Sequence, residues 1–252
     1  MNQTYRDYEV VIVDDGSTDD SVSIIESFND SRIKLFSQKN QGPSSARNLG
    51  IEKAQNEWLI FLDADDVMMP DALEQFSYYI SNYPGVDILC GGYSTAGKTI
   101  CRFPDVTLIN NGFRAFVLNW LALLAGTFVC RRENCRNTLY DARLWRLEDI
   151  DFMMRLFRIS SCILYFPKIV VRIEERFANL SVFKQPITKD YRGYLDLSGK
   201  SFWEKVSIYH LYNSARDEYP EEAEKLYPSF KYRFFLRLST ILINYYRFYN
   251  KR

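Results

Sequence analysis

The sequence has 252 residues and is electrically balanced, with 32 basic and 32 acidic side chains and a single histidine. Apolar residues make up 47% and charged residues 25%, a globular composition that excludes a largely disordered chain. Zero net charge argues against broad nucleic-acid binding, so we expect no nucleic-acid partner. We recognise neither a basic-then-apolar leader nor an uncharged apolar run of about 18 residues, which favours a cytoplasmic protein.

The five cysteines form no C-x-x-C pair. We therefore expect them to be small, unpaired, buried side chains in a reducing compartment. They are Cys90, Cys101, Cys130, Cys135 and Cys162.

Apolar runs alternate with helical spacings over the first 90 residues. Strands are predicted at 9–13, 32–36, 58–62 and 86–90, and helices at 17–28, from Pro43 onward and at 70–83. Strand–helix–strand repeats of this length predict an α/β, Rossmann-like fold with a mostly parallel sheet flanked by helices.

The later chain is less regular. Helices are predicted at 113–124 and 147–159, and strands at 126–130, 162–166 and 169–173. Beyond about residue 186 the strand signal disappears, and helices are predicted near 201–217 and 227–249. We therefore divide the chain into an α/β domain, 1–185, and a helical C-terminal extension, 186–252.

Two acidic clusters follow predicted strands. Asp14-Asp15-Gly16-Ser17 comes after the first strand, and Asp63-Ala64-Asp65-Asp66 comes after the third. Ligands of open parallel sheets bind beyond the carboxyl ends of the strands. Clustered carboxylates repel one another unless a cation compensates them, and Mg²⁺ or Mn²⁺ shared with a diphosphate suits such oxygen ligands. The structural alternative is that Asp66 or Asp71 caps the following helix.

A phosphorylation-receiver domain is a competing interpretation. Such a domain also carries an acid pair after its first strand and an acceptor aspartate after its third, which Asp14, Asp15 and Asp63 roughly match. The expected downstream lysine is a poor match, because Lys168 comes too late in the chain. The chain is also much longer than a receiver.

Three motifs in the right order resemble those of family 2 glycosyltransferases. They are residues 3–9 with 13–19, residues 40–50 (NQGPSSARNLG) and residues 61–66 (FLDADD). The resemblance is good over residues 3 to about 95, weaker to about 175, and does not cover the rest. It implies a GT-A fold for 1–185 and transfer of a sugar, with inversion, from a nucleotide-diphosphate donor. A saccharide or lipid-linked acceptor in surface polysaccharide or glycolipid synthesis is the implied context.

The resemblance also implies roles for individual residues. Asp15, with Asp14, would hold the nucleoside base, Arg47 would lie near the base and diphosphate, Asp63 near the ribose, and Asp65 on the metal. These residue types suit the roles, because carboxylates accept from a pyrimidine N–H, a guanidinium matches phosphate oxygens, and a metal stabilises the departing diphosphate. UDP is the default donor nucleotide.

Residues 147–155 (LEDIDFMMR) resemble the later Glu-Asp motif of the family, which opens a helix facing the acceptor. An attacking hydroxyl must lose its proton, so a carboxylate base is required. We assign Asp149 as this base and Glu148 as a supporting residue, and we expect Asp151 to face solvent. The alternative is an acidic first turn that only stabilises the helix dipole.

Two departures from the family bear on activity. The resemblance implies an opening strand and turn before the motif at residues 3–9, which this sequence does not show, so we expect an N-terminal truncation relative to the family. Either Met1 is not the natural start, or the sequence is a fragment, or the rest of the chain compensates. One hypothesis is therefore a catalytically impaired GT-A-like protein that binds nucleotide or a partner. Residues 172–181 also hold no histidine, and His210 lies in the predicted helical extension as a structural residue. Metal binding would then depend on Asp65, donor phosphates and water.

The stretch 230–252 combines six basic residues with eight aromatic ones and has no acid. One interpretation is an interfacial helix that contacts the inner membrane face as a peripheral anchor. The other is a helix packed on the catalytic domain, with a solvated basic edge.

Overall fold

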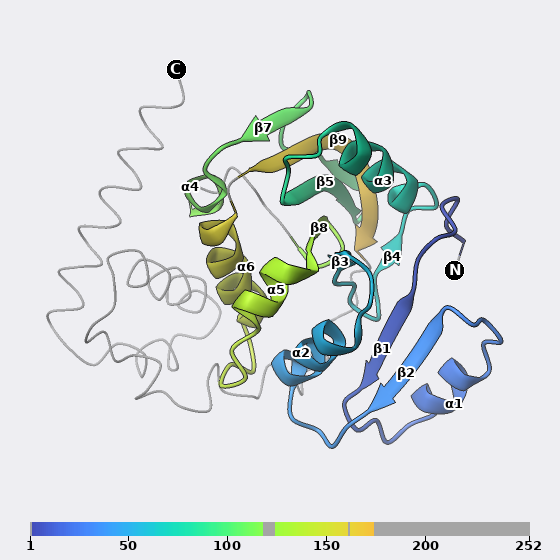
Figure 1. Cartoon of the computed structure of the whole chain (residues 1–252). Coiled ribbons are helices and arrows are strands. Elements are labelled where there is room, and N and C mark those ends of the chain that lie inside the picture. The colour runs from blue at the N-terminus through green and yellow to red at the C-terminus, as the bar shows by residue number, and fades with distance from the viewer. Residues whose placement is uncertain (1, 118–123, 161, 174–252) are drawn as a thin grey trace, which may run out of the picture.

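The computed structural model describes residues 2–117, 124–160 and 162–173 (Figure 1). Within them the chain forms a mixed α/β fold in which helices flank a sheet, as the sequence predicts. The helical extension, with His210 and the stretch 230–252, lies outside the described residues. No helix in the described ranges combines the length and apolarity needed to cross a bilayer.

The N-terminal unit is a small parallel sheet. β1 (Val10–Asp14) pairs with β2 (Ile33–Ser37), and α1 (Ser21–Glu26) connects them. The predicted helix 17–28 is thus shorter than expected. α2 (Pro43–Lys53) begins with proline in its first turn, where the missing N–H costs nothing, and packs on β1.

A seven-stranded sheet carries the rest of the described fold, with the order β3-β8-β5-β9-β4 and two attached strands, β6 and β7. Its strands are β3 (Trp58–Ile60), β4 (Val67–Met68), β5 (Ile88–Thr95), β6 (Lys98–Ile100), β7 (Thr107–Ile109), β8 (Phe128–Arg131) and β9 (Ile163–Ile173). Only β5 and β9 are parallel, and the other five pairings are antiparallel. The prediction of a mostly parallel sheet is wrong here, because an apolar run indicates a buried strand but not its direction.

The two sheets are separate between β1 and β3. The Val10 N–H donates to the Arg32 carbonyl, and the Asp14 carbonyl accepts from the Gln38 N–H, so both bonds face β2. Because the direction alternates along a strand, the amides of Val11 and Val13 point to the other edge of β1. Among the described residues that edge pairs with no strand, and β3 likewise pairs only with β8. All residues of both strands are only half-buried despite their apolar sequences.

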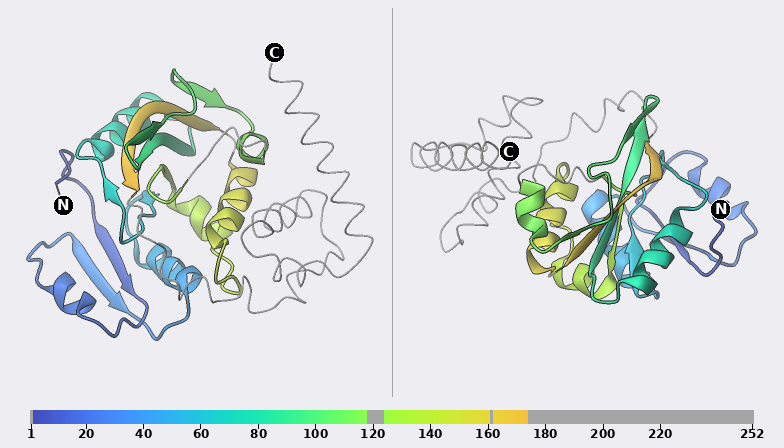
Figure 2. Two further views of the ribbon diagram at one scale, coloured as in Figure 1. Left: turned by 180° about the vertical axis from the view of Figure 1, so that it is seen from behind. Right: turned by 90° about the horizontal axis from the view of Figure 1, so that it is seen from above.

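The larger sheet is covered on both faces (Figure 2). α3 (Ala72–Asn82) packs over one face through Phe76, whose ring contacts Phe166 edge-on. On the other face, α6 (Glu148–Ile159) buries Phe152, Leu156 and Phe157. α4 (Gly112–Val117) and α5 (Arg132–Thr138) lie beside α6.

β9 is one continuous strand, where the sequence predicts two separated at Pro167. Its pairing with β5 shifts register on both sides of Gly92, which accommodates the proline. Glycine is needed in β5, because a Cβ on Gly91 would lie 2.7 Å from Val170 Cγ1. Prediction and structure therefore agree on the segment and differ on its continuity.

The cysteines are unpaired, as predicted. Cys90, Cys130 and Cys135 are buried, Cys162 is partly buried, and Cys101 is exposed, against expectation. Cys101 lies just beyond the short β6, which only pairs at the margin of the sheet.

Candidate active site

Arg47 of α2 brings together two acids that are distant in sequence. Its Nη2 lies 3.0 Å from Asp63 Oδ1, just beyond β3, and its Nη1 lies 2.6 Å from Glu148 Oε1, at the start of α6. The guanidinium also lies over the ring of Tyr140, 5.3 Å from its centroid. Three of the predicted site residues therefore meet at one place, where α2, β3 and α6 converge.

The Arg47–Glu148 pair is largely shielded from water, with 21% and 11% of the two side chains exposed. Burial raises the pKa of Glu148, and the nearby Arg47 opposes this shift. Burial alone would lower the pKa of Arg47, but Tyr140, Glu148 and Asp63 together raise it. The pair is thus mutually stabilising, and removal of the arginine would leave a buried, uncompensated carboxylate.

Asp149 is the next residue and behaves differently. Its Oδ1 accepts the Ile150 N–H at 2.7 Å, and it makes no ion pair with any residue in the described ranges. Burial raises the pKa of Asp149, an effect that the Ile150 N–H and Arg47 partly offset. A half-buried carboxylate with a raised pKa and no ion-pair partner is suited to accept a proton.

The backbone before these acids is unusual. Leu147, the residue that precedes α6, has φ 59°, a left-handed conformation that is strained for a leucine. Glu148, Asp149 and Asp151 all lie in the first helical turn, where the positive end of the dipole favours acids.

Asp151 does not face solvent, so that prediction is wrong. It is 6% exposed and accepts from Arg155 Nε at 2.9 Å, one turn further along α6. The i,i+4 spacing of an acid and an arginine is the sequence signal that could have indicated this pair.

Asp14 and Asp15 lie at the carboxyl end of β1 and hold the loops around them. Asp15 accepts from Gln38 Nε2 at 2.7 Å and from the amides of Gln41 and Gly42 at 2.9 and 2.8 Å. Hydrogen bonds from the hydroxyl and amide of Ser17 lower the pKa of Asp14. These bonds fix the carboxylates without assigning a ligand, so the base-binding roles stay predictions.

Asp65 is exposed. The described part of the chain contains no cluster of three or more metal-ligating side chains. Mg²⁺ is commonly held by one or two carboxylates together with substrate phosphates, so an accessible single aspartate fits a site that the donor completes. The metal role of Asp65 remains a prediction.

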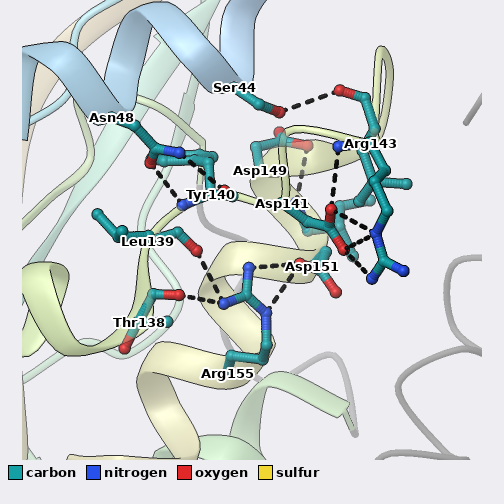
Figure 3. A network of polar contacts seen from close by, with 12 residues as sticks. Ser44, Asn48, Thr138, Leu139, Tyr140, Asp141, Arg143, Asp149, Asp151 and Arg155 are labelled. Carbon is teal, nitrogen blue, oxygen red and sulfur yellow. Dashed lines mark hydrogen bonds and ion pairs between the residues drawn. The ribbon is translucent and has the colours of Figure 1, made fainter. Parts of the chain in front are cut away.

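Sequence reasoning missed two residues that organise the site, Asn48 and Tyr140. Figure 3 shows the Asn48 side chain facing the backbone of Tyr140, with Asp149 close by. The Asn48 amide both donates to and accepts from that backbone. The position of Asn48 beside Arg47 in the motif at 40–50 was the available signal.

The model of glycosyl transferase family 2 matches residues 1–129. A cholesterol galactosyltransferase from Borreliella burgdorferi is 33% identical over 184 residues, which cover 64% of this chain and 50% of that protein. The glycosyltransferase GlyG from Streptococcus pneumoniae is 26% identical, with coverage of 66% and 60%. The matches thus span only about half of these relatives.

Solved structures confirm the fold. Staphylococcus aureus TarS in complex with UDP-GlcNAc superposes with a TM-score of 0.67 and 20% identity, covering 82% of this chain and 60% of that one. A complex of TarS with UDP gives a TM-score of 0.63. The family match covers more than half of the chain, and its fold agrees with these GT-A structures. The chain belongs to glycosyl transferase family 2.

Proposed function

We propose that the protein is an inverting glycosyltransferase that moves a sugar from a nucleotide-diphosphate donor, by default a UDP-sugar, to a hydroxyl group of a saccharide or lipid-linked acceptor. The observation that carries the proposal is the convergence of Arg47, Asp63 and Glu148 beside the carboxylate of Asp149, which has no ion-pair partner among the described residues. The TarS complexes with UDP-GlcNAc and UDP support the donor class. Synthesis of surface polysaccharide or glycolipid at the inner membrane face is the context we propose.

In this mechanism Asp149 accepts the proton of the acceptor hydroxyl as the hydroxyl oxygen attacks the anomeric carbon. The new glycosidic C–O bond forms on the face opposite the donor phosphate. The bond from the anomeric carbon to the phosphate oxygen breaks, and the nucleotide diphosphate departs with its electron pair. Arg47 keeps Glu148 charged and in place, so that the start of α6 is fixed beside the reacting hydroxyl.

We propose that Asp65 contributes to a Mg²⁺ or Mn²⁺ site together with the donor phosphates. A bound divalent ion would offset negative charge on the departing diphosphate. Because the protein would supply a single carboxylate, we expect metal affinity to be weak without nucleotide.

Calorimetry with UDP, with and without Mn²⁺, followed by donor-turnover assays tests the proposal. We expect Mn²⁺-dependent binding in the wild type, its loss in Asp65→Ala, and turnover that falls about 100-fold or more in Asp149→Asn. The exposed Asp105→Asn variant is the matched control and should match the wild type.

Binding of UDP without turnover of any UDP-sugar donor would instead support the impaired, nucleotide-binding alternative. Binding that is identical with and without Mn²⁺ would contradict the metal assignment alone.

A further inference from the structure

The segment 139–147 joins α5 to α6, and we call it the strap. It leads directly into Glu148 and Asp149, so its conformation determines where these two acids lie. Both of its end residues, Leu139 and Leu147, have positive φ values, 38° and 59°. Leucine rarely adopts this conformation, and it persists only where surrounding contacts enforce it.

Contacts from α2 enforce it on one side. Asn48 Nδ2 donates to the Tyr140 carbonyl at 2.9 Å, and the Tyr140 N–H donates to Asn48 Oδ1 at 2.7 Å. Both polar atoms of the Asn48 side chain are therefore used on a single residue that lies 92 positions away in the sequence. One turn earlier, Ser44 Oγ donates to the Leu144 carbonyl at 3.0 Å.

Contacts from α6 fix the strap on the other side. Arg155 Nη1 donates to the Leu139 carbonyl at 2.8 Å and also to the Thr138 carbonyl. The Asp151 carboxylate holds the same guanidinium (Figure 3). The start of the strap thus lies between a helix that carries Arg47 and a helix that carries Asp149.

Tyr140 passes this constraint to the acids. Its ring stacks on Phe152 of α6, with centroids 4.0 Å apart and an interplanar angle of 7°, and the guanidinium of Arg47 lies over it. A shift of the Tyr140 backbone would therefore move the first turns of α6, which carry Glu148 and Asp149.

We infer that Asn48 is a positioning residue for sugar transfer, which acts through Tyr140 to hold Glu148 and Asp149 in their reactive placement. This inference rests on the proposed function. Asn48 has no role in proton transfer, so its loss should reduce the chemical step and leave capture of the donor nearly unchanged. Displacements of about 1 Å at a reacting group can lower rates about 100-fold.

The test compares Asn48→Ala with the wild type in a steady-state donor-turnover assay. We expect kcat to fall about 10- to 100-fold while KM for the donor changes less than about 3-fold. Asn48→Asp retains the oxygen that accepts from Tyr140 N–H, so its kcat should lie between the two. It also serves as the milder variant if Asn48→Ala fails to fold.

Ile51→Val is the matched control, because Ile51 is buried on the same helix and makes no polar contact with the strap. It should lower the melting temperature with kcat unchanged. A double variant adds a second criterion: in the Asp149→Asn background, Asn48→Ala should lower residual turnover by less than about 2-fold, because the residue through which it acts is already lost.

Hydrogen exchange of amides 139–150 should increase in Asn48→Ala while β5 and β9 stay protected. An active wild type with undiminished kcat in Asn48→Ala, or an equal loss in Ile51→Val, would overturn the positioning role alone. A wild type that turns over no donor would overturn the proposed function and the positioning role together, whatever the exchange shows.

Discussion

At the scale of single residues, two adjacent carboxylates have opposite environments. The negative charge of Glu148 is compensated by the ion pair with Arg47, whereas Asp149 has no ion-pair partner among the described residues. Burial raises the pKa of both. Burial acts on both acids, but only Glu148 has an arginine partner. Glu148 is therefore suited to a structural role and Asp149 to proton exchange, a common arrangement where acid–base chemistry takes place.

The raised pKa of Asp149 predicts a stability change. The folded state holds the Asp149 proton more tightly than the unfolded state, so ionisation lowers stability as pH rises above the ordinary value of 3.8 through the raised pKa. Asp149→Asn should therefore raise the melting temperature by a few degrees at pH 7, although it lowers turnover about 100-fold or more. Thermal unfolding at pH 7 and pH 4 measures this effect, and the gain should shrink at pH 4.

Asp105→Asn, an exposed acid, should show no such gain at either pH. A melting temperature for Asp149→Asn at or below that of the wild type at pH 7 would contradict the raised pKa.

Arg47 predicts a second effect. Arg47→Ala should lower the free energy of unfolding by about 3 kcal/mol, because it leaves the buried Glu148 carboxylate unpaired. Arg47→Ala/Glu148→Gln should recover part of that loss, because burying a neutral amide costs less free energy than burying an unpaired carboxylate. Urea unfolding at pH 7 measures both. Equal stability of the single and double variants would show that the ion pair is not the source of the loss.

Much of this site follows from sequence motifs, and the rest depends on tertiary contact. Arg47, Asp63 and Glu148 were all predicted as site residues, and the structure places them together. Their mutual pairing could not be predicted, because residues 47 and 148 meet only through the fold. The role of Tyr140 could not be predicted from motifs for the same reason, since that role comes from stacking and main-chain contacts.

At the scale of secondary structure, the long periodic elements were predictable and the short ones were not. α2, α3, α6, β1 and β2 lie close to their predicted ranges, whereas β5 begins at Ile88 and continues to Thr95, five residues beyond the predicted end. The structure adds β4, β6, β7 and α5, which the sequence analysis did not predict. These elements have two to seven residues, too few for hydrophobic periodicity to show.

The junction between α2 and the strap offers a prediction at this scale. Gly42 precedes α2 with φ 93°, and a Cβ there would lie 2.7 Å from Trp145 Cζ3 in the strap. Gly42→Ala should therefore destabilise the protein by about 2 kcal/mol and alter the fluorescence of Trp145. Urea unfolding and emission spectra measure these effects.

Gly97→Ala is the control for backbone strain, because Gly97 has φ 74° but no atom within 4 Å of an added Cβ. It should be less destabilising and leave the emission spectrum unchanged. If both variants behave alike, the contact with Trp145 does not constrain the strap.

At the scale of the whole molecule, the described strands form two sheets, and β1 of the smaller sheet does not pair with β3 of the larger one. Val11 and Val13 direct their amides away from β2, and no described strand pairs with them. We expect these two amides to exchange hydrogen at least about 10-fold faster than those of Val10 and Ile12, which face β2. Exchange measured by NMR checks this, and equal protection of all four amides would contradict an open edge.

An open strand edge affects how the protein behaves in concentrated solution. Within the described part of the chain, the amides of Val11 and Val13 in β1 have no strand partner along a run of valine and isoleucine, so two copies can template each other. Turbidity should therefore rise steeply with protein concentration, well before any loss of helical signal. Val11→Lys would place a charge at that strand edge and should keep the turbidity low.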